Sequence, residues 1–238
     1  MAVKKNTFRK IPVAGWLSGV FTLTFEYAFY LVALFINSLP ARAAQVFVPK
    51  IAAIDDAIPF LPVFVYGYVF SYAFWVIAPV LTALPGKRSL YNYFVSNILS
   101  VLAGFAILVA FPTCLDRAAE GILGAASGKG LTAWLLRTIF ENDGGQIGRN
   151  LLPSFHCMLS TTIWLSVARK KEIPPAARIA VGISAMTVYC STLFVKQHYF
   201  ADAVAGILLA AVCHFAARAL DFGGKIEKKA ADKKEKSE

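Results

Sequence analysis

The sequence predicts an all-α membrane protein, a bundle of six transmembrane helices with both termini in the cytoplasm. Two features of the composition support this fold class. Of the 238 residues, 58% are apolar and only 16% are charged, whereas a soluble domain usually carries about 25% charged residues. The apolar residues also gather in long blocks without period-two alternation, which favours membrane helices over a β-barrel or a large soluble core.

Six apolar blocks are each close to the roughly 20 residues that a helix needs to cross the hydrocarbon core of a bilayer. They run from Ala14 to Leu39, Phe60 to Leu84, Tyr93 to Phe111, Leu152 to Ala168, Ala176 to Val195 and Phe200 to Leu220. The fourth block is short, so we expect its outer end to lie at the level of the lipid headgroups. The first is followed by a sequence that resembles a signal-peptide cleavage site, Ala41-Arg42-Ala43. Its apolar run is longer than a typical signal core, so we expect this span to be retained.

Basic residues gather in the connections on one side of this predicted bundle. They precede the first block, separate the second from the third and the fourth from the fifth, and follow the sixth: Lys4, Lys5, Arg9, Lys10, Lys87, Arg88, Arg169, Lys170, Lys171, Arg178 and a lysine-rich tail. The positive-inside rule makes this side cytoplasmic. Contact with anionic headgroups explains the net charge of +10, so we expect a bilayer partner and no nucleic acid.

The chain therefore divides into three parts. Residues 1–13 form a basic cytoplasmic N-terminus, residues 14–220 form the membrane domain, and residues 221–238 form a charged tail of low complexity that we expect to be disordered. The long outer connection, residues 112–151, contains apolar residues at helical spacing from Leu131 to Ile139, followed by Gly144-Gly145. This pattern predicts a short helix in the membrane interface and a turn after it.

Two of the three histidines lie where predicted helices begin. His156 follows Pro153 and Ser154 at the start of the fourth block, and His198 directly precedes the sixth. Asp202 lies four residues after His198, one helical turn away, so its carboxylate can reach the imidazole. A carboxylate in this place fixes the tautomer and makes the other ring nitrogen a better nucleophile or base. Both blocks run inward from the non-cytoplasmic face, so we expect the two histidines to share one site there.

These motifs resemble the type 2 phosphatidic acid phosphatase superfamily, whose central element is Pro-Ser-x-His and whose last element is Ser-Arg-x5-His-x3-Asp. Residues 153–156 fit the central element. Ser191, His198 and Asp202 fit the last one, but Thr192 stands in place of its arginine. The first element, Lys-x6-Arg-Pro, is absent, and the nearest segment is residues 111–117. The resemblance covers about residues 85–220, and residues 191–199 also look like the inositol phosphorylceramide synthase-like branch.

The resemblance implies phosphoryl transfer through a phosphohistidine, without a metal or cofactor. It makes His198 the nucleophile and Asp202 the residue that orients its ring. His156 would protonate the leaving alkoxide and then activate the attacking water or alcohol. Ser154 would bind the phosphoryl oxygens. Two histidines and one carboxylate that is already committed are also too few ligands for a metal site.

Because the family arginine is missing at Thr192, another cation must stabilise the phosphoryl oxygens. Lys196, Arg117 and Arg149 are all predicted on the same face, and Lys196 is the closest to His198 in sequence. We therefore expect Lys196 and Arg117 to take this role ahead of Arg149. For Lys196 and Arg149 the alternative is an ordinary headgroup anchor. For Arg117 the alternative is an ion pair with one of its neighbours, Asp116 or Glu120.

Glu26 lies in the middle of the first block. A carboxyl inside a membrane span indicates function by default, although pairing with a tyrosine or serine of the bundle is an equal alternative.

Three functions remain open at this level. The first is hydrolysis of a lipid phosphate or diphosphate at the outer face, where a site between spans admits an acyl or prenyl chain. The second is transfer of a phosphoryl-headgroup to a lipid alcohol by the same residues. The third is a lipid-handling membrane protein without catalysis. The sequence makes no prediction about oligomeric state.

Overall fold

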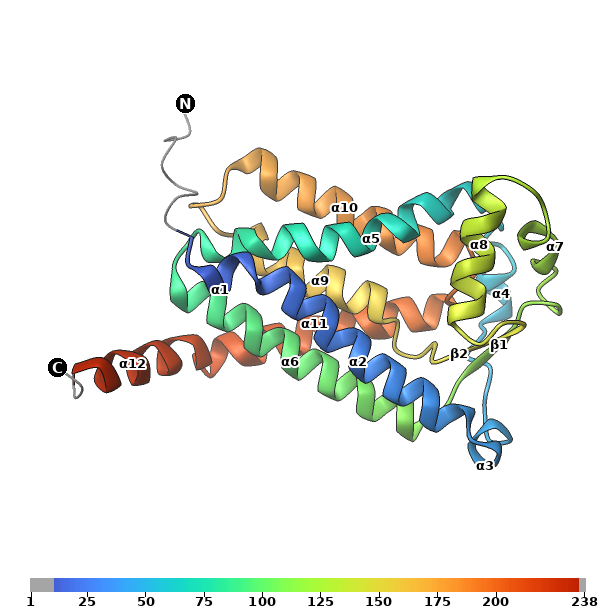
Figure 1. Cartoon of the computed structure of the whole chain (residues 1–238), viewed down its shortest axis with the longest axis horizontal. Coiled ribbons are helices and arrows are strands. Elements are labelled where there is room, and N and C mark those ends of the chain that lie inside the picture. Colours follow the sequence, from blue (N-terminus) through green and yellow to red (C-terminus); the bar gives the residue numbers. More distant parts are fainter. Residues whose placement is uncertain (1–10, 236–238) are drawn as a thin grey trace.

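The computed structural model describes residues 11–235, which form a bundle of helices with a small cap at one end (Figure 1). The long helices are α2 (Ser18–Ser38), α5 (Val65–Ile77), α6 (Lys87–Ala110), α9 (Phe155–Ala168), α10 (Pro175–Phe194), α11 (Phe200–Ala219) and α12 (Phe222–Glu235). The shorter elements are α1 (Val13–Trp16), α3 (Pro40–Ala43), α4 (Ala52–Asp55), η2 (Pro62–Phe64), η3 (Ala78–Ala83), β1 (Cys114–Asp116), α7 (Leu123–Ala126), α8 (Leu131–Asn142) and β2 (Ile147–Arg149).

Five helical segments of the described chain are long and apolar enough to cross a membrane. They are α2, the continuous run of η2, α5 and η3, and then α6, α10 and α11. They correspond to five of the six predicted blocks. The remaining one, the fourth block, is the helix α9, which has only 14 residues and is therefore about 21 Å long, shorter than the roughly 30 Å hydrocarbon core.

The helix α9 is short because it lies inside the protein. Figure 1 shows it between the other long helices, and it packs against α10, α11 and α6. Of its residues, all but a few are buried, including four with hydroxyl side chains: Ser160, Thr161, Thr162 and Ser166. A helix covered by protein needs neither the length nor the uniform hydrophobicity of a helix covered by lipid. The sequence correctly predicts an apolar helix here, but α9 is shorter than a full-length span, so the count of six spans stays a prediction.

The basic connections meet at one end of the bundle, opposite the cap (Figure 1). A polar cavity of about 310 Å³ at this end is lined by Arg88, Lys170, Arg218 and Asp221, among others. The connections between blocks two and three and between four and five therefore lie together, as predicted, and the described chain also begins and ends there. The basic residues before residue 11 lie outside the described part of the chain, and the cytoplasmic side stays a prediction.

Where the sequence predicts a disordered tail, the structure has the helix α12 (Phe222–Glu235). This segment is rich in lysine, glutamate and alanine, which have high helix propensity. Its start is docked on α6, because the backbone N–H of Gly223 donates to Asn92 Oδ1 at 2.8 Å. A side chain at residue 223 would collide with the Arg88 carbonyl, so glycine permits this close contact.

The cap is built from residues 112–151 together with α3 and α4 (Figure 1). The predicted short helix is confirmed as α8, although its place in the membrane interface stays a prediction, and the predicted turn is formed by Gly144 and Gly145, both with positive φ. The turn leads into β2, which pairs antiparallel with β1. This sheet of two three-residue strands was not predicted, because segments so short carry no recognisable alternation of apolar residues.

Helices α9 and α11 approach each other closely where both begin. A Cβ atom at Gly206 would lie only 2.4 Å from the Ser154 carbonyl oxygen. In the same region the Ser154 N–H donates to the Asp202 carbonyl at 3.0 Å. The absence of a side chain at residue 206 therefore lets the two histidine-bearing helix starts lie side by side.

We predict that Gly206→Ala lowers the free energy of unfolding by about 1–3 kcal/mol, because the new methyl group must push backbone away from backbone. Gly124→Ala is the matched control, since a Cβ atom there has no neighbour within 4 Å. Thermal unfolding of both purified variants in detergent measures the difference. Equal midpoints for the two variants would contradict the packing role of Gly206.

Candidate active site

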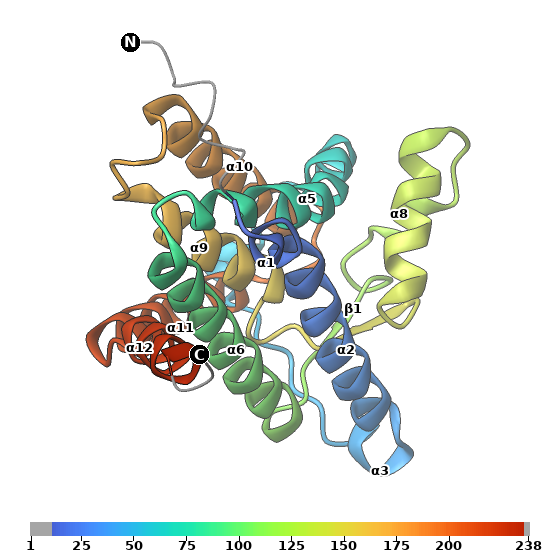
Figure 2. The ribbon, with the colours of Figure 1, turned by 60° about the vertical axis from the view of Figure 1, so that its left-hand side comes forward.

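His156 and His198 line one cavity of about 530 Å³. Its walls come from α2, α5, α8 and the start of α9, and Figure 2 shows α8 standing beside α2 and α5 at this end of the bundle. The centroids of the two imidazole rings are 6.2 Å apart. The structure therefore brings together two histidines that are more than forty residues apart in sequence, as the motifs predicted.

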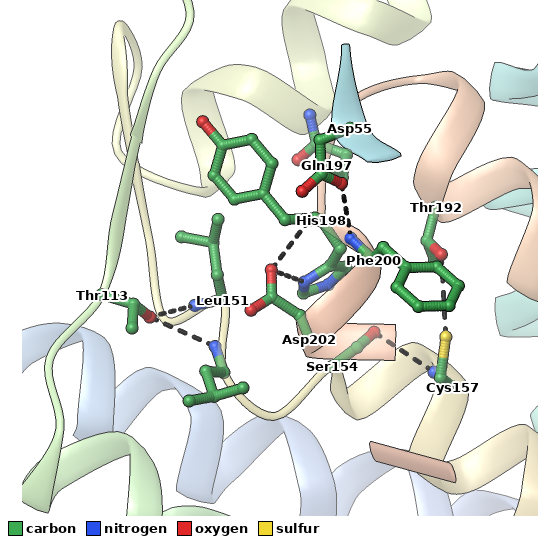
Figure 3. A network of polar contacts seen from close by, with 12 residues as sticks. Asp55, Thr113, Leu151, Ser154, Cys157, Thr192, Gln197, His198, Phe200 and Asp202 are labelled. Carbon is green, nitrogen blue, oxygen red and sulfur yellow. Dashed lines mark hydrogen bonds and ion pairs between the residues drawn. The ribbon is translucent and has the colours of Figure 1, made fainter. Parts of the chain in front are cut away.

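Ser154 fixes the start of the helix that carries His156. Its side chain is the N-cap of α9, where Oγ accepts a hydrogen bond from the Cys157 N–H at 3.3 Å (Figure 3). Ser154 is fully buried, and its own N–H is held by the Asp202 carbonyl. The serine predicted to bind phosphoryl oxygens therefore also aligns α9 with α11.

The imidazole of His156 is packed among aromatic rings. It stacks on Tyr68 with ring centroids 4.1 Å apart, and it meets Trp75 edge-on at 4.8 Å and Tyr72 at 5.9 Å. Its Nε2 atom is buried without a hydrogen-bond partner among the described residues. Contacts with aromatic rings fix the orientation of the ring without engaging its nitrogens, so these remain available for proton transfer.

His198 is held by the tight connection between α10 and α11. The Thr192 carbonyl accepts hydrogen bonds from the N–H groups of Gln197 at 3.0 Å and His198 at 3.2 Å. Lys196 adopts a left-handed backbone conformation, with φ of 52°, which turns the chain between the two helices. The position of the imidazole is therefore set by backbone contacts and not by the side chain alone.

Asp202 stands behind the His198 ring, as its spacing predicts (Figure 3). Its Oδ2 atom lies 3.8 Å from His198 Nδ1 and accepts a hydrogen bond from the Tyr199 N–H at 2.8 Å. The longer separation exceeds a normal hydrogen bond, but it places the carboxylate beside the Nδ1 edge of the ring. Because Nδ1 faces the carboxylate, Nε2 is the nitrogen left for reaction with a substrate.

Arg117 is the cation most closely tied to this centre. Its guanidinium is fully buried, lies 2.7 Å from Asp143 Oδ2, and donates to Gln197 Oε1 at 3.2 Å. The ion pair thus forms with Asp143 and not with either sequence neighbour. Arg117 links the residue preceding His198 to the cavity wall, because Asp143 lines the cavity.

Asp143 is a site residue that sequence reasoning missed. Its carboxylate binds Arg117 through one oxygen and accepts a hydrogen bond from the Tyr30 hydroxyl through the other. Burial raises the pKa of Asp143, and the neighbouring Arg117 guanidinium opposes that shift. The only signal in the sequence was a carboxylate directly before Gly144-Gly145, which indicates a turn but does not identify the partner.

None of the three predicted cations lines the cavity itself, nor does Ser154; Arg117 reaches the wall through Asp143, whereas Lys196 and Arg149 bond elsewhere. The Lys196 ammonium donates to the Asp55 carbonyl at 2.6 Å, and Arg149 makes a long contact of 3.4 Å with the Asn37 carbonyl. At the family's arginine position, Thr192 is buried and contacts Cys157 Sγ at 3.7 Å, across α10 and α9. The missing arginine is therefore replaced by a contact between helices.

Among residues 11–235, no three His, Cys, Asp or Glu side chains are grouped closely enough to hold a metal ion. The polar residues that line the cavity include the two histidines, tyrosines on α2 and α5, and the carboxyl groups of Glu26 and Asp143.

A family model described as the PAP2 superfamily matches residues 42–216, well over half of the chain. The chain belongs to the PAP2 superfamily. The match spans both histidine motifs and confirms the superfamily that these motifs indicate. Comparisons with curated proteins and with solved structures returned no match. PAP2 proteins are generally phosphatases or phosphotransferases, and five apolar helices make this one an integral membrane protein of that type.

Proposed function

We propose that this PAP2 protein hydrolyses a lipid phosphate or diphosphate at the non-cytoplasmic membrane face, through a phosphohistidine at His198. The observation that supports the proposal is the shared cavity, in which the two imidazoles lie 6.2 Å apart and a carboxylate stands behind one of them. This spacing leaves room for a phosphoryl group between the rings.

In the first step, His198 Nε2 attacks phosphorus and the bond from phosphorus to the lipid oxygen breaks. His156 donates a proton to the leaving oxygen, so that the lipid departs as an alcohol, or as a monophosphate from a diphosphate. The Asp202 carboxylate stabilises the positive charge that develops on the His198 ring.

In the second step, His156 takes a proton from water as the water oxygen attacks the phosphohistidine. The bond from Nε2 to phosphorus breaks, inorganic phosphate leaves, and both imidazoles return to their starting state. Protons and bonds therefore balance over one cycle without a further reactant.

Phosphoryl transfer also needs positive charge and hydrogen-bond donors at the phosphoryl oxygens. We assign this role to Arg117 and to the Ser154 hydroxyl, which accepts one hydrogen bond and retains its proton for donation. Lys196 and Arg149 are weaker candidates, because each bonds to a backbone carbonyl outside the cavity wall, whereas Arg117 is paired with Asp143 on that wall.

The walls of the cavity support a lipid substrate. They are mainly apolar and aromatic, and the residues lining them include the partly exposed rings of Tyr27 on α2 and Trp134 on α8. Aromatic side chains are favoured at the membrane interface, where a lipid headgroup enters and its chain stays in hydrocarbon.

Headgroup transfer is the second candidate, and two observations favour it. Residues 191–199, together with the absent Arg-Pro element, resemble the inositol phosphorylceramide synthase-like branch, and aromatic rings pack closely against His156, which would attenuate attack by water. In this reaction a lipid alcohol instead of water attacks the intermediate, and the same residues act.

The deciding experiment offers the purified protein phosphatidate, a prenyl diphosphate and diacyl headgroup donors, each with and without an alcohol acceptor. Release of free phosphate supports hydrolysis, whereas appearance of the headgroup on the acceptor supports transfer. A protein that handles lipids without catalysis would give neither product.

We predict that vanadate inhibits this activity and that chelators leave it unchanged. Vanadate adopts the trigonal-bipyramidal geometry of a phosphoryl group under attack, and the proposed steps route no bond through a metal. A dose series of each reagent in the same assay measures both effects. Insensitivity to millimolar vanadate would contradict the phosphohistidine route, and loss of activity with a chelator would contradict the metal-independent reaction.

A further inference from the structure

Glu26 is a buried carboxyl that no step of the proposed reaction uses. It lies in the middle of α2, is only 5% exposed, and lines the same cavity as both histidines. Within the described residues, no hydrogen bond or ion pair involves its carboxyl group. A carboxyl inside a membrane span is costly unless it finds a partner.

The hydroxyl groups on either side of Glu26 are engaged elsewhere. One turn toward the basic end, Thr22 bonds to the Tyr93 hydroxyl at 2.5 Å, and one turn toward the cap, Tyr30 donates to Asp143. The hydroxyl groups one turn away on α2 therefore donate no hydrogen bond to the Glu26 carboxyl. Tyr68 and Tyr72 of α5 line the same cavity, but neither hydroxyl is bonded to Glu26, so its carboxyl is left to face the contents of the cavity.

The position of Glu26 along α2 indicates which part of a substrate it meets. Tyr30, one turn nearer the cap, packs with its ring centroid 6.4 Å from that of Phe155, the residue before His156. Four residues of helix correspond to about 6 Å, so Glu26 lies roughly this much deeper in the membrane than the level of the imidazoles. A phosphate held at His198 would place the first few bonds of its lipid chain beside Glu26.

We infer that Glu26 binds a hydrogen-bond donor on the lipid, a hydroxyl or ammonium group a few bonds from the phosphate. This inference rests on the proposed function and specifies its substrate class. Glu26 would favour amino-alcohol phosphates over alkyl or prenyl phosphates. The latter carry no hydrogen-bond donor at this depth and would leave the carboxyl without a partner.

The test compares two probes of equal chain length, a long-chain 2-amino-3-hydroxy alkyl phosphate and a plain alkyl phosphate. The measured quantity is the ratio of their kcat/KM values for phosphate release. We expect the wild-type protein to prefer the amino-alcohol phosphate, and Glu26→Leu to lower this ratio by roughly tenfold or more, as for loss of a hydrogen bond to a charged group. Glu26→Gln keeps an acceptor but loses the charge, so its kcat/KM ratio should lie between those of the wild-type protein and Glu26→Leu.

Thr24→Val is the matched control. Thr24 lines the same cavity from the same helix, but its hydroxyl is satisfied by the Val20 carbonyl at 2.8 Å. Its ratio should stay at the wild-type value. Removal of a buried carboxyl from a span should not impair folding, and the isosteric Glu26→Gln decides the question if Glu26→Leu does not fold.

The possible results separate this inference from the function on which it rests. If the wild-type protein releases phosphate from both probes with a ratio near one, or if the Glu26 variants keep the wild-type ratio, the inference is wrong and the phosphatase proposal stands. If the wild-type protein and His198→Ala are equally inactive on both probes and on phosphatidate, the phosphatase proposal itself fails.

Discussion

His198→Ala is expected to lower turnover by about four orders of magnitude or more, the usual effect of removing a nucleophile from a catalytic unit. No other side chain in the cavity has an equivalent nitrogen backed by a carboxylate. The variant should also fail to form an acid-labile phosphoenzyme when it is mixed with radiolabelled substrate and quenched with alkali. Turnover and labelling together distinguish loss of the nucleophile from weaker substrate binding.

Two further variants sharpen this test. Asp202→Asn keeps the size of the side chain and its acceptor for the Tyr199 N–H, but it removes the charge beside His198. We expect it to lower turnover by about 10²–10⁴-fold. His214→Asn is the control, because His214 lies near the other end of α11. This variant should keep both turnover and phosphoenzyme labelling at the wild-type level. Labelling of His198→Ala at the wild-type level would rule out His198 as the nucleophile.

The part of the site that could be predicted from the sequence depends on local spacing. Asp202 reaches His198 because both lie within one helical turn, and that geometry is fixed by the helix itself. His156 and His198 meet because both precede apolar blocks of the same direction. The direction of each helix follows from the number of spans, including α9, although α9 is too short to be a full span.

The rest of the site depends on contacts between distant segments. The pair formed by Arg117 and Asp143 joins the end of β1 to the end of α8, and its geometry depends on a two-stranded sheet whose strands are too short to have a sequence pattern. Lys196 was favoured because it is close to His198 in sequence. The left-handed turn at Lys196 directs its side chain to Asp55 instead, which shows that proximity along the chain does not imply a shared direction.

Arg117→Met is expected to impair both activity and stability. It leaves the Asp143 carboxylate without its cation, and breaking a buried ion pair from one side costs about 3–5 kcal/mol. It also removes positive charge from beside the residue that precedes His198, so we expect turnover to fall by about 100-fold or more. Thermal unfolding in detergent and phosphate release measure the two effects separately.

The double variant Arg117→Met/Asp143→Asn separates the structural role of Arg117 from its role in the reaction. With both charges removed, no buried carboxylate is left unpaired, so stability should return toward that of the wild type. Activity should stay low, because the phosphoryl oxygens still lack their cation. Arg149→Met is the matched control. Its guanidinium contacts a backbone carbonyl at 3.4 Å, so we expect a change in stability within about 0.5 kcal/mol. If the double variant recovered activity together with stability, Arg117 would only hold the cap in place, and the phosphoryl group would take its positive charge from another residue.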